Sequence, residues 1–294
     1  MRKLTLVVTC TDRKSLPAPA HLQARNLPAA PVSERAQEWR RRLRRSHTER
    51  ALLQLYQGDA WSQVGHLACE ADRRGFATTI LVASAGLGLR DARGTGPSYA
   101  ATFAPGHLDS VGATRSEVGE WWDKLKAAPG AMDLRDVQGP VLLVLSEPYA
   151  RAMKADLKEL AGGRVDALLV GGESDIDGIP RLPADLRLRR TLGGTATSVN
   201  LRMATRWMTR LRGPSLHTET DRRNWDQWAE TVRQVESYDR QKLTDQQVLT
   251  FIESVREVDR TISATRALRK LRDGGSACEQ KRFGALFRSE AGSA

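Results

Sequence analysis

The sequence has few cysteines, few aromatic residues and no long apolar run. Its three cysteines, Cys10, Cys69 and Cys278, are odd in number and far apart in 294 residues, which excludes a disulfide framework and a cysteine zinc cluster. The five histidines show no HxH, HxxxH or HExxH spacing, so no metal site is predicted. No apolar run approaches the roughly 18–20 residues that cross a bilayer, and the first one, at 4–9, is too short for a secretory signal. We therefore expect a cytoplasmic protein with no membrane partner.

Positive charge is the main compositional signal. Lys and Arg total 46 against 35 Asp and Glu, a net charge of +11 that is typical of proteins with a polyanion partner, most often nucleic acid. Residues 181–294 hold 22 of these cations and 14 of the anions, and so most of the excess. A second basic run lies at 40–45. It fits either a solvated helix face or a phosphate-contacting patch, and from it we take Arg41 and Arg44 as nucleic-acid-binding candidates.

Short apolar runs that alternate with helical patterns indicate an α/β fold. Buried strands are predicted at 4–9, 78–83, 141–145 and 167–170, with a fifth at 187–191. Continuous apolar strands separated by helices are typical of a mainly parallel sheet flanked by helices. From about residue 215 only helical segments follow. The sequence therefore predicts an α/β domain over 1–213 and an all-α domain over 214–294.

The last two helical segments have the pattern of a helix-turn-helix. Residues 261–272 form the first helix, 273–275 a glycine turn, and 276–288 a second helix whose first turn would enter a DNA groove. A plain helical bundle is the alternative. The nucleic-acid-binding candidates here are Arg269, Gln280, Lys281 and Arg282.

Polar residues follow the predicted strands, where parallel sheets bind ligands. Cys10 stands where a nucleophile could lie, and Asp12 and Glu147 are candidate acid–base groups. Each also has an ordinary interpretation, as a small buried thiol, a helix cap or a surface charge. Tyr99 or Trp122 could stack a base. The ligand-binding candidates of this site are Lys14, Ser15, Ser84, Gly86 and Tyr99.

A glycine loop at 193–198 is a second candidate for phosphate binding. Glycines let an anion approach the backbone, and free N–H groups at the start of the next helix attract it. The candidates are Gly193, Gly194, Thr195, Ser198 and Arg202, and the alternative is an ordinary capped loop. Neither a Walker A motif nor a complete GxGxxG fingerprint is present, so no cofactor is identified.

Two segments near the N-terminus resemble a known family. They are Val7-Val8-Thr9-Cys10-Thr11-Asp12-Arg13-Lys14-Ser15, followed by Pro17-Ala18-Pro19-Ala20, and Ile80-Leu81-Val82-Ala83-Ser84-Ala85-Gly86-Leu87, with Tyr99 downstream. This opening third resembles bacterial and phage domains of unknown function related to the YaaA peroxide-stress proteins. The resemblance implies an α/β domain linked to nucleic-acid or nucleotide handling. It carries over to Cys10, Lys14, Ser15, Ser84, Gly86 and Tyr99, and the sequence departs from the pattern at Asp12-Arg13 and at Gly86-Leu87-Gly88.

These features together predict a nucleic-acid-acting protein. The α/β domain would perform base-modifying or glycosidic chemistry in a modification or phage-defence pathway, and the helical domain would hold DNA or RNA. The alternative is a non-catalytic DNA-binding subunit of a regulatory or defence complex, with protein partners on the α/β domain. A third interpretation is an enzyme for small nucleotides.

Overall fold

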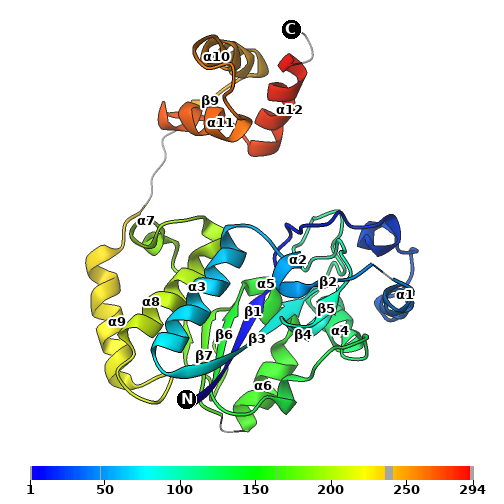
Figure 1. Ribbon diagram of the computed structural model, residues 1–294, viewed down its shortest axis with the longest axis vertical. Coiled ribbons are helices and arrows are strands. Elements are labelled where there is room, and N and C mark those ends of the chain that lie inside the picture. Colours follow the sequence, from blue (N-terminus) through cyan, green and yellow to red (C-terminus); the bar gives the residue numbers. More distant parts are fainter. Residues whose placement is uncertain (1, 47, 164, 236–240, 292–294) are drawn as a thin grey trace. The chain divides into compact units, whose positions relative to one another are not determined.

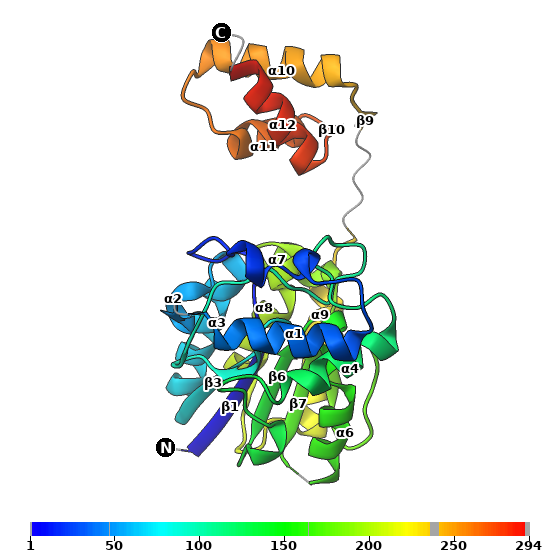
Figure 2. The ribbon, with the colours of Figure 1, turned by 90° about the vertical axis from the view of Figure 1, so that its right-hand side faces the viewer.

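The chain forms two units, Met1–Gln234 and Val235–Ala294. The computed structural model describes residues 2–46, 48–163, 165–235 and 241–291 (Figures 1 and 2). The first unit is an α/β domain and the second is helical, as the sequence predicts.

A six-stranded sheet of order β4-β3-β1-β6-β7-β8 organises the first unit. Every neighbouring pair is parallel except β3 and β4, which confirms the mainly parallel sheet. The expected strand at 187–191 is helical instead. Asp185 accepts a hydrogen bond from the backbone N–H of Arg187 and so caps a helical turn there. The strands are β1 (Arg2–Thr9), β3 (Phe76–Ser84), β4 (Gly88–Asp91), β6 (Val141–Leu145), β7 (Ala167–Gly171) and β8 (Arg181–Leu182).

The central strands are buried on both faces because helices cover both sides of the sheet. All residues of β6 and β7 are buried, as are Leu4–Val8 in β1. Helices α3 and α8 cover one face, and α1, α4 and α6 the other (Figures 1 and 2). Two short strands, β2 (Arg50–Ala51) and β5 (Thr95–Gly96), pair outside this sheet. The helices are α1 (Val32–Arg44), α2 (Leu52–Leu55), α3 (Asp59–Arg73), α4 (Arg115–Leu125), α5 (Glu147–Ala152), α6 (Lys154–Gly162), α7 (Arg189–Leu192), α8 (Val199–Arg210) and α9 (Glu219–Val232).

Helix α9 belongs to the α/β unit, which corrects the predicted domain boundary. Trp225 of α9 packs against Trp207 of α8 with ring centroids 5.7 Å apart, and both are buried. The indole of Trp207 also donates to the carbonyl of Leu216, which anchors the segment between the two helices. The chain therefore divides at Gln234-Val235 and not at Gly213-Pro214.

The second unit is a bundle of three helices around its own small core. These are α10 (Asp245–Val258), α11 (Ala264–Asp273) and α12 (Gln280–Ala291), and Ile252, Leu271 and Phe283 lie among the buried residues between them. The last helix begins at Gln280 rather than at 276, because Ser276-Ala277 (β10) pairs with Gln241-Lys242 (β9). Six residues thus separate α11 from α12, more than the three to four of a helix-turn-helix. The structure favours the plain bundle.

The new boundary also changes where the positive charge lies. Residues 235–294 contain eleven Lys and Arg and nine Asp and Glu, so this unit is nearly neutral. Residues 181–213 contain eight Arg and one Asp. The basic excess of the C-terminal part of the chain therefore belongs to the α/β unit.

This boundary predicts the behaviour of two truncations. A chain ending at Gln234 should unfold cooperatively, because the Trp207–Trp225 contact is intact. A chain ending at Gly213 should lose at least about 3 kcal/mol of unfolding free energy, the usual cost of removing a buried tryptophan. Urea unfolding followed by tryptophan fluorescence measures both, and equal stability of the two truncations would contradict the boundary.

Candidate functional site

The sheet reverses its direction of winding between β1 and β6. From β1 the chain crosses to β3 on one side, and β6, β7 and β8 then follow on the other. Loops that leave such neighbouring strands diverge, and ligands of doubly wound sheets bind in the crevice between them, beyond the carboxyl ends of the strands. The candidate site is therefore the segment after Thr9 together with the segment after Leu145.

Four residues from four segments meet at this point. The Cys10 sulfur lies 3.0 Å from the Tyr149 hydroxyl and 3.5 Å from that of Tyr99. The Tyr99 hydroxyl lies 2.9 Å from that of Tyr56. Three of the four tyrosines in the chain thus gather behind Cys10. We call these four residues and Lys14 and Ser84 the strand-end cluster.

The hydrogen bonds around Ser84 orient the phenols. Its hydroxyl oxygen accepts from the backbone N–H groups of Gly86 and Leu87, at 3.2 and 2.9 Å. Both lone pairs are then used, so the Ser84 hydroxyl donates to the Tyr99 oxygen, 2.6 Å away. The hydroxyl hydrogen of Tyr99 is left to point at the Cys10 sulfur. Burial raises the pKa of Tyr99 and Tyr149 well above 10.0, so both phenols stay protonated.

Lys14 lies over these tyrosines without a carboxylate partner. Its ammonium is 4.2 Å from the centre of the Tyr99 ring, and it donates to the carbonyls of Thr11 and Asp12 at 3.3 and 3.2 Å. No ion pair joins it to a carboxylate in the part of the chain that the structure describes. Burial lowers the pKa of Lys14 below its usual 10.5, and the charges of Cys10 and Asp12 only oppose this. The arrangement favours a reactive amine.

Gly86 is required by the close approach of Tyr99. A Cβ at Gly86 would lie 2.3 Å from the Tyr99 ring, far inside van der Waals contact. Two indoles fix this turn: Trp39 donates to the carbonyl of Gly86 at 2.7 Å, and Trp121 to that of Ala85 at 2.8 Å. The predicted base-stacking role of Tyr99 and Trp122 is therefore wrong. Gly86 and Lys14 cover the Tyr99 ring, while Trp122 is 2% exposed and donates to Asp156.

The structure thus brings Cys10, Lys14, Ser84, Gly86 and Tyr99 together, and it adds Tyr56 and Tyr149. Tyr149 lies in α5, four residues after the end of β6, and this closeness to a predicted strand end is the sequence signal that could have found it. No comparable pattern marks Tyr56.

Three other predicted residues of this region have different surroundings. Ser15 accepts a hydrogen bond from Arg50 at 3.1 Å. Glu147 is 59% exposed and pairs with Arg151 at 2.5 Å. Asp12 is exposed, and no contact of its carboxylate with Glu147 occurs among the described residues. The two carboxylates do not form a pair.

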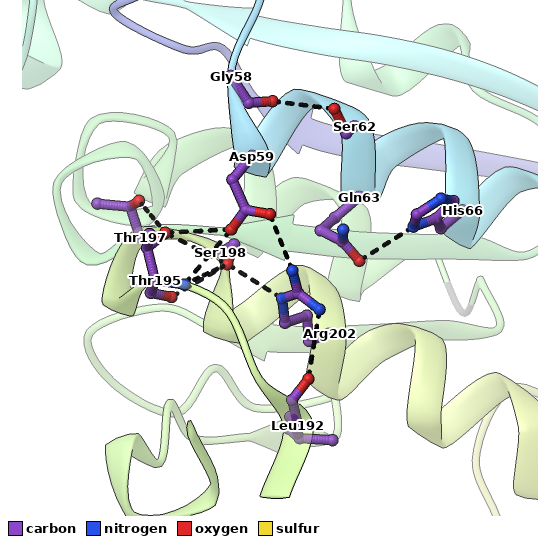
Figure 3. A network of polar contacts seen from close by, with 10 residues as sticks. All are labelled: Gly58, Asp59, Ser62, Gln63, His66, Leu192, Thr195, Thr197, Ser198 and Arg202. Carbon is purple, nitrogen blue, oxygen red and sulfur yellow. Dashed lines mark hydrogen bonds and ion pairs between the residues drawn. The ribbon is translucent and has the colours of Figure 1, made fainter. Parts of the chain in front are cut away.

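The glycine loop at 193–198 already holds an anion of the chain itself. Figure 3 shows the Asp59 carboxylate accepting from the N–H and hydroxyl of Thr195, at 3.4 and 3.3 Å, and from Arg202 at 2.8 Å. Arg202 also donates to Ser198 and to the carbonyl of Leu192. Gly193 and Gly194 have φ values of 76° and 78°, which glycine adopts readily, and a Cβ at Gly194 would lie 2.3 Å from Arg202. This occupancy favours the capped-loop interpretation.

The nucleic-acid-binding candidates are scattered. Arg41 pairs with Glu38 at 2.6 Å, and Arg44 is exposed at the end of α1. In the second unit, Arg269 and Gln280 are exposed, and Arg282 pairs with Asp245 at 2.5 Å. The side chain of Lys281 lies outside the described residues.

The comparisons add no relative. No protein-family model matches the chain, and neither the curated proteins nor the solved structures contain a match. The resemblance to YaaA-related domains thus stays a prediction. Among the described residues, no helix is long and apolar enough to span a bilayer, and no three metal-ligating side chains gather.

The packing at Gly86 predicts a position-specific effect of alanine. Gly86→Ala should cost about 1–3 kcal/mol of unfolding free energy, the usual cost of overpacking a core. Gly65→Ala is the control, because that glycine lies in α3 with nothing within 4 Å of its Cβ position; it should stabilise the protein by about 0.5–1 kcal/mol. Chemical denaturation measures both, and a neutral Gly86→Ala would contradict the contact.

The Asp59 network predicts an acid-dependent loss of stability. Hydrogen bonds, first from Ser198 and then from Thr195, lower the pKa of Asp59 below its usual 3.8. The stabilisation is therefore full above pH 3.8 and disappears as pH falls through the lower folded-state pKa. Asp59→Asn should remove this pH dependence, whereas the exposed Asp177→Asn should not. Thermal unfolding between pH 2 and 7 tests it, and identical pH profiles for Asp59→Asn and the wild type would contradict the role of the carboxylate.

Proposed function

We propose that the protein is an enzyme that acts on a base or nucleotide of a nucleic acid, with the strand-end cluster as its catalytic centre. One observation carries the proposal: Lys14 is a desolvated amine without a carboxylate partner among the described residues, beside Cys10, at the reversal of the sheet. The net charge of +11 supports a polyanionic substrate.

A lowered pKa gives Lys14 the properties of a nucleophile. More of the amine is neutral at a given pH, and a neutral amine attacks an electrophilic carbon. In glycosidic chemistry the Lys14 nitrogen forms a bond to the sugar C1′ while the bond from C1′ to the base breaks. The base leaves with that electron pair and then takes the proton that the attached nitrogen gives up. In this proposal Cys10, which is hydrogen-bonded to Tyr149 at 3.0 Å, carries this proton. The nitrogen lone pair next forms a C1′=N bond while the bond from C1′ to the ring oxygen breaks, and that oxygen takes a proton from solvent. The resulting protonated imine is the adduct that borohydride reduces.

A specific observation also supports the alternative, a non-catalytic DNA-binding subunit of a larger complex. Tyr56 and Tyr99 are each 1% exposed, and their hydrogen bonds are satisfied within the chain. Such a network also suits a purely structural core. The two functions differ in whether substitutions at Lys14 abolish a reaction or leave binding as the sole activity.

Substitutions at Lys14 test the catalytic proposal. The full chain is incubated with duplex DNA, single-stranded DNA and tRNA, products are identified by nucleoside mass spectrometry, and covalent adducts are trapped by borohydride reduction. We expect product and adduct from the wild type, with a rate that rises as pH increases through the lowered pKa of Lys14. Lys14→Ala and Lys14→Arg should abolish both.

The exposed Lys124→Ala is the matched control and should retain wild-type activity. Product formation by Lys14→Ala would contradict the nucleophile. Binding of a polymer without product or adduct would favour the non-catalytic subunit.

A further inference from the structure

Four arginines line a surface hollow of about 510 Å³ at the opposite end of the sheet. Arg74 follows α3, whose C-terminus leads into β3 and therefore lies at the amino edge of the sheet. Arg206 and Arg210 come from the last turns of α8, and Arg212 follows them. We call these four residues, with Thr209 and Asn224, the arginine hollow.

Three of the four guanidinium groups have no carboxylate partner among the residues that the structure describes. Arg74 pairs with Glu70 at 3.3 Å and donates to the carbonyl of Thr209. No ion pair joins Arg206, Arg210 or Arg212 to a carboxylate within the described ranges. Burial and then the charge of Arg206 lower the pKa of Arg210, as expected for neighbouring cations without a counterion. An anion in the hollow would relieve this repulsion.

Trp228 holds two of these groups in place. The guanidiniums of Arg206 and Arg210 each lie 5.0 Å from the centre of its ring. Cation–π contacts fix the plane of a guanidinium and leave its N–H edge free for a ligand. The side chains are therefore ordered before any ligand arrives, which lowers the entropic cost of binding.

A second basic hollow of the α/β unit is a useful contrast. It measures about 620 Å³ and includes Arg41, Arg42 and Arg45. There Glu38 pairs with Arg41 at 2.6 Å and with Arg42 at 2.7 Å. Hydrogen bonds, first from Arg41 and then from Arg42, lower the pKa of Glu38 to about 2, so it stays ionised. The single carboxylate of Glu38 thus engages two of the three guanidinium groups of that hollow and compensates one of their three charges.

We propose that the arginine hollow binds the phosphate backbone of a nucleic acid. Guanidinium forks match phosphate oxygens, and a group of them suits successive phosphates better than one carboxylate. The proposal rests on the substrate class of the proposed function but not on its chemistry. It places the polymer-binding surface on the α/β unit, outside the candidates predicted from the sequence.

Helix α8 connects this surface to the strand-end region. Asn200 in its first turn donates to the carbonyl of Leu145, at the carboxyl end of β6. From Asn200 to Arg210 the helix rises about 15 Å. A strand advances about 3.4 Å per nucleotide, so at least about five nucleotides are needed to reach both ends of the helix. Shorter oligonucleotides should engage the hollow alone.

The test is a titration of the full chain with a fluorescent duplex and with the corresponding single strand, at about 50 and 200 mM salt. Arg206→Gln/Arg210→Gln should bind at least about tenfold more weakly at low salt, and the slope of log affinity against log salt should fall by about 2. Arg212→Gln, at an exposed position, should reduce that slope by about 1 without changing thermal unfolding.

The matched control removes two equal charges elsewhere. Arg93 and Arg135 are 72% and 63% exposed and pair with Asp91 and Asp133. Arg93→Gln/Arg135→Gln should keep the wild-type affinity. An equal loss in this control would show that net charge alone governs binding and would overturn the proposal. Unchanged binding by both Arg206→Gln/Arg210→Gln and Arg212→Gln would do the same.

Further arms separate the source of the phosphate and the two proposals. Inorganic phosphate and ATP are tested by thermal unfolding. If either raises the melting temperature of the wild type but not of Arg206→Gln/Arg210→Gln, and neither polymer binds, the ligand of the hollow is a small anion and the nucleic-acid proposal is overturned. The exposed Lys124→Ala should bind polymer like the wild type. If polymer binding depends on the arginine hollow but no product or adduct forms, the binding proposal is supported and only the catalytic proposal is contradicted.

Discussion

The central position of β1 is the constraint on which the rest of the α/β unit depends. It pairs in parallel with β3 along one edge and with β6 along the other, and its apolar run fits because both faces are covered. The chain passes from β1 to β3 on one side and later adds β6 on the other side of β1. The loops that follow β1 and β6 therefore diverge at the carboxyl ends of these two strands. Cys10 and Tyr149 meet across that point because the two strands are neighbours.

Burial at the carboxyl end of β1 explains both the packing of the strand-end cluster and the lowered pKa of Lys14. Tyr99 reaches Cys10 because Gly86 has no side chain in its path, and the Lys14 ammonium lies over the same ring. The lysine loses water without gaining a carboxylate, which shifts its equilibrium toward the neutral amine. The packing of Tyr99 and the lowered pKa of Lys14 therefore have one cause, so a substitution that loosens Tyr99 should also rehydrate Lys14.

The sequence predicted those parts of the fold and site that depend on local pattern. Continuous apolar runs identified four of the central strands. The polar residues after these runs included Cys10, Lys14 and Ser84, which lie together because parallel strands end at one edge of the sheet. It missed contacts between distant segments, such as Asp59 entering the glycine loop 136 residues away. Helix α9 was assigned to the wrong unit because an amphipathic pattern does not reveal which core it covers.

Charge illustrates the same distinction between composition and placement. Counting residues reveals a basic chain, but only the fold shows which cations keep a counterion within the molecule. Arg41 forms an ion pair with Glu38, and Arg202 forms one with Asp59. Arg206 and Arg210 have Trp228 instead, and an aromatic ring orients a guanidinium without cancelling its charge. An arginine held by an aromatic ring remains available to an external anion, so the partner of the arginine, rather than the local density of arginines, is the better guide to a binding surface.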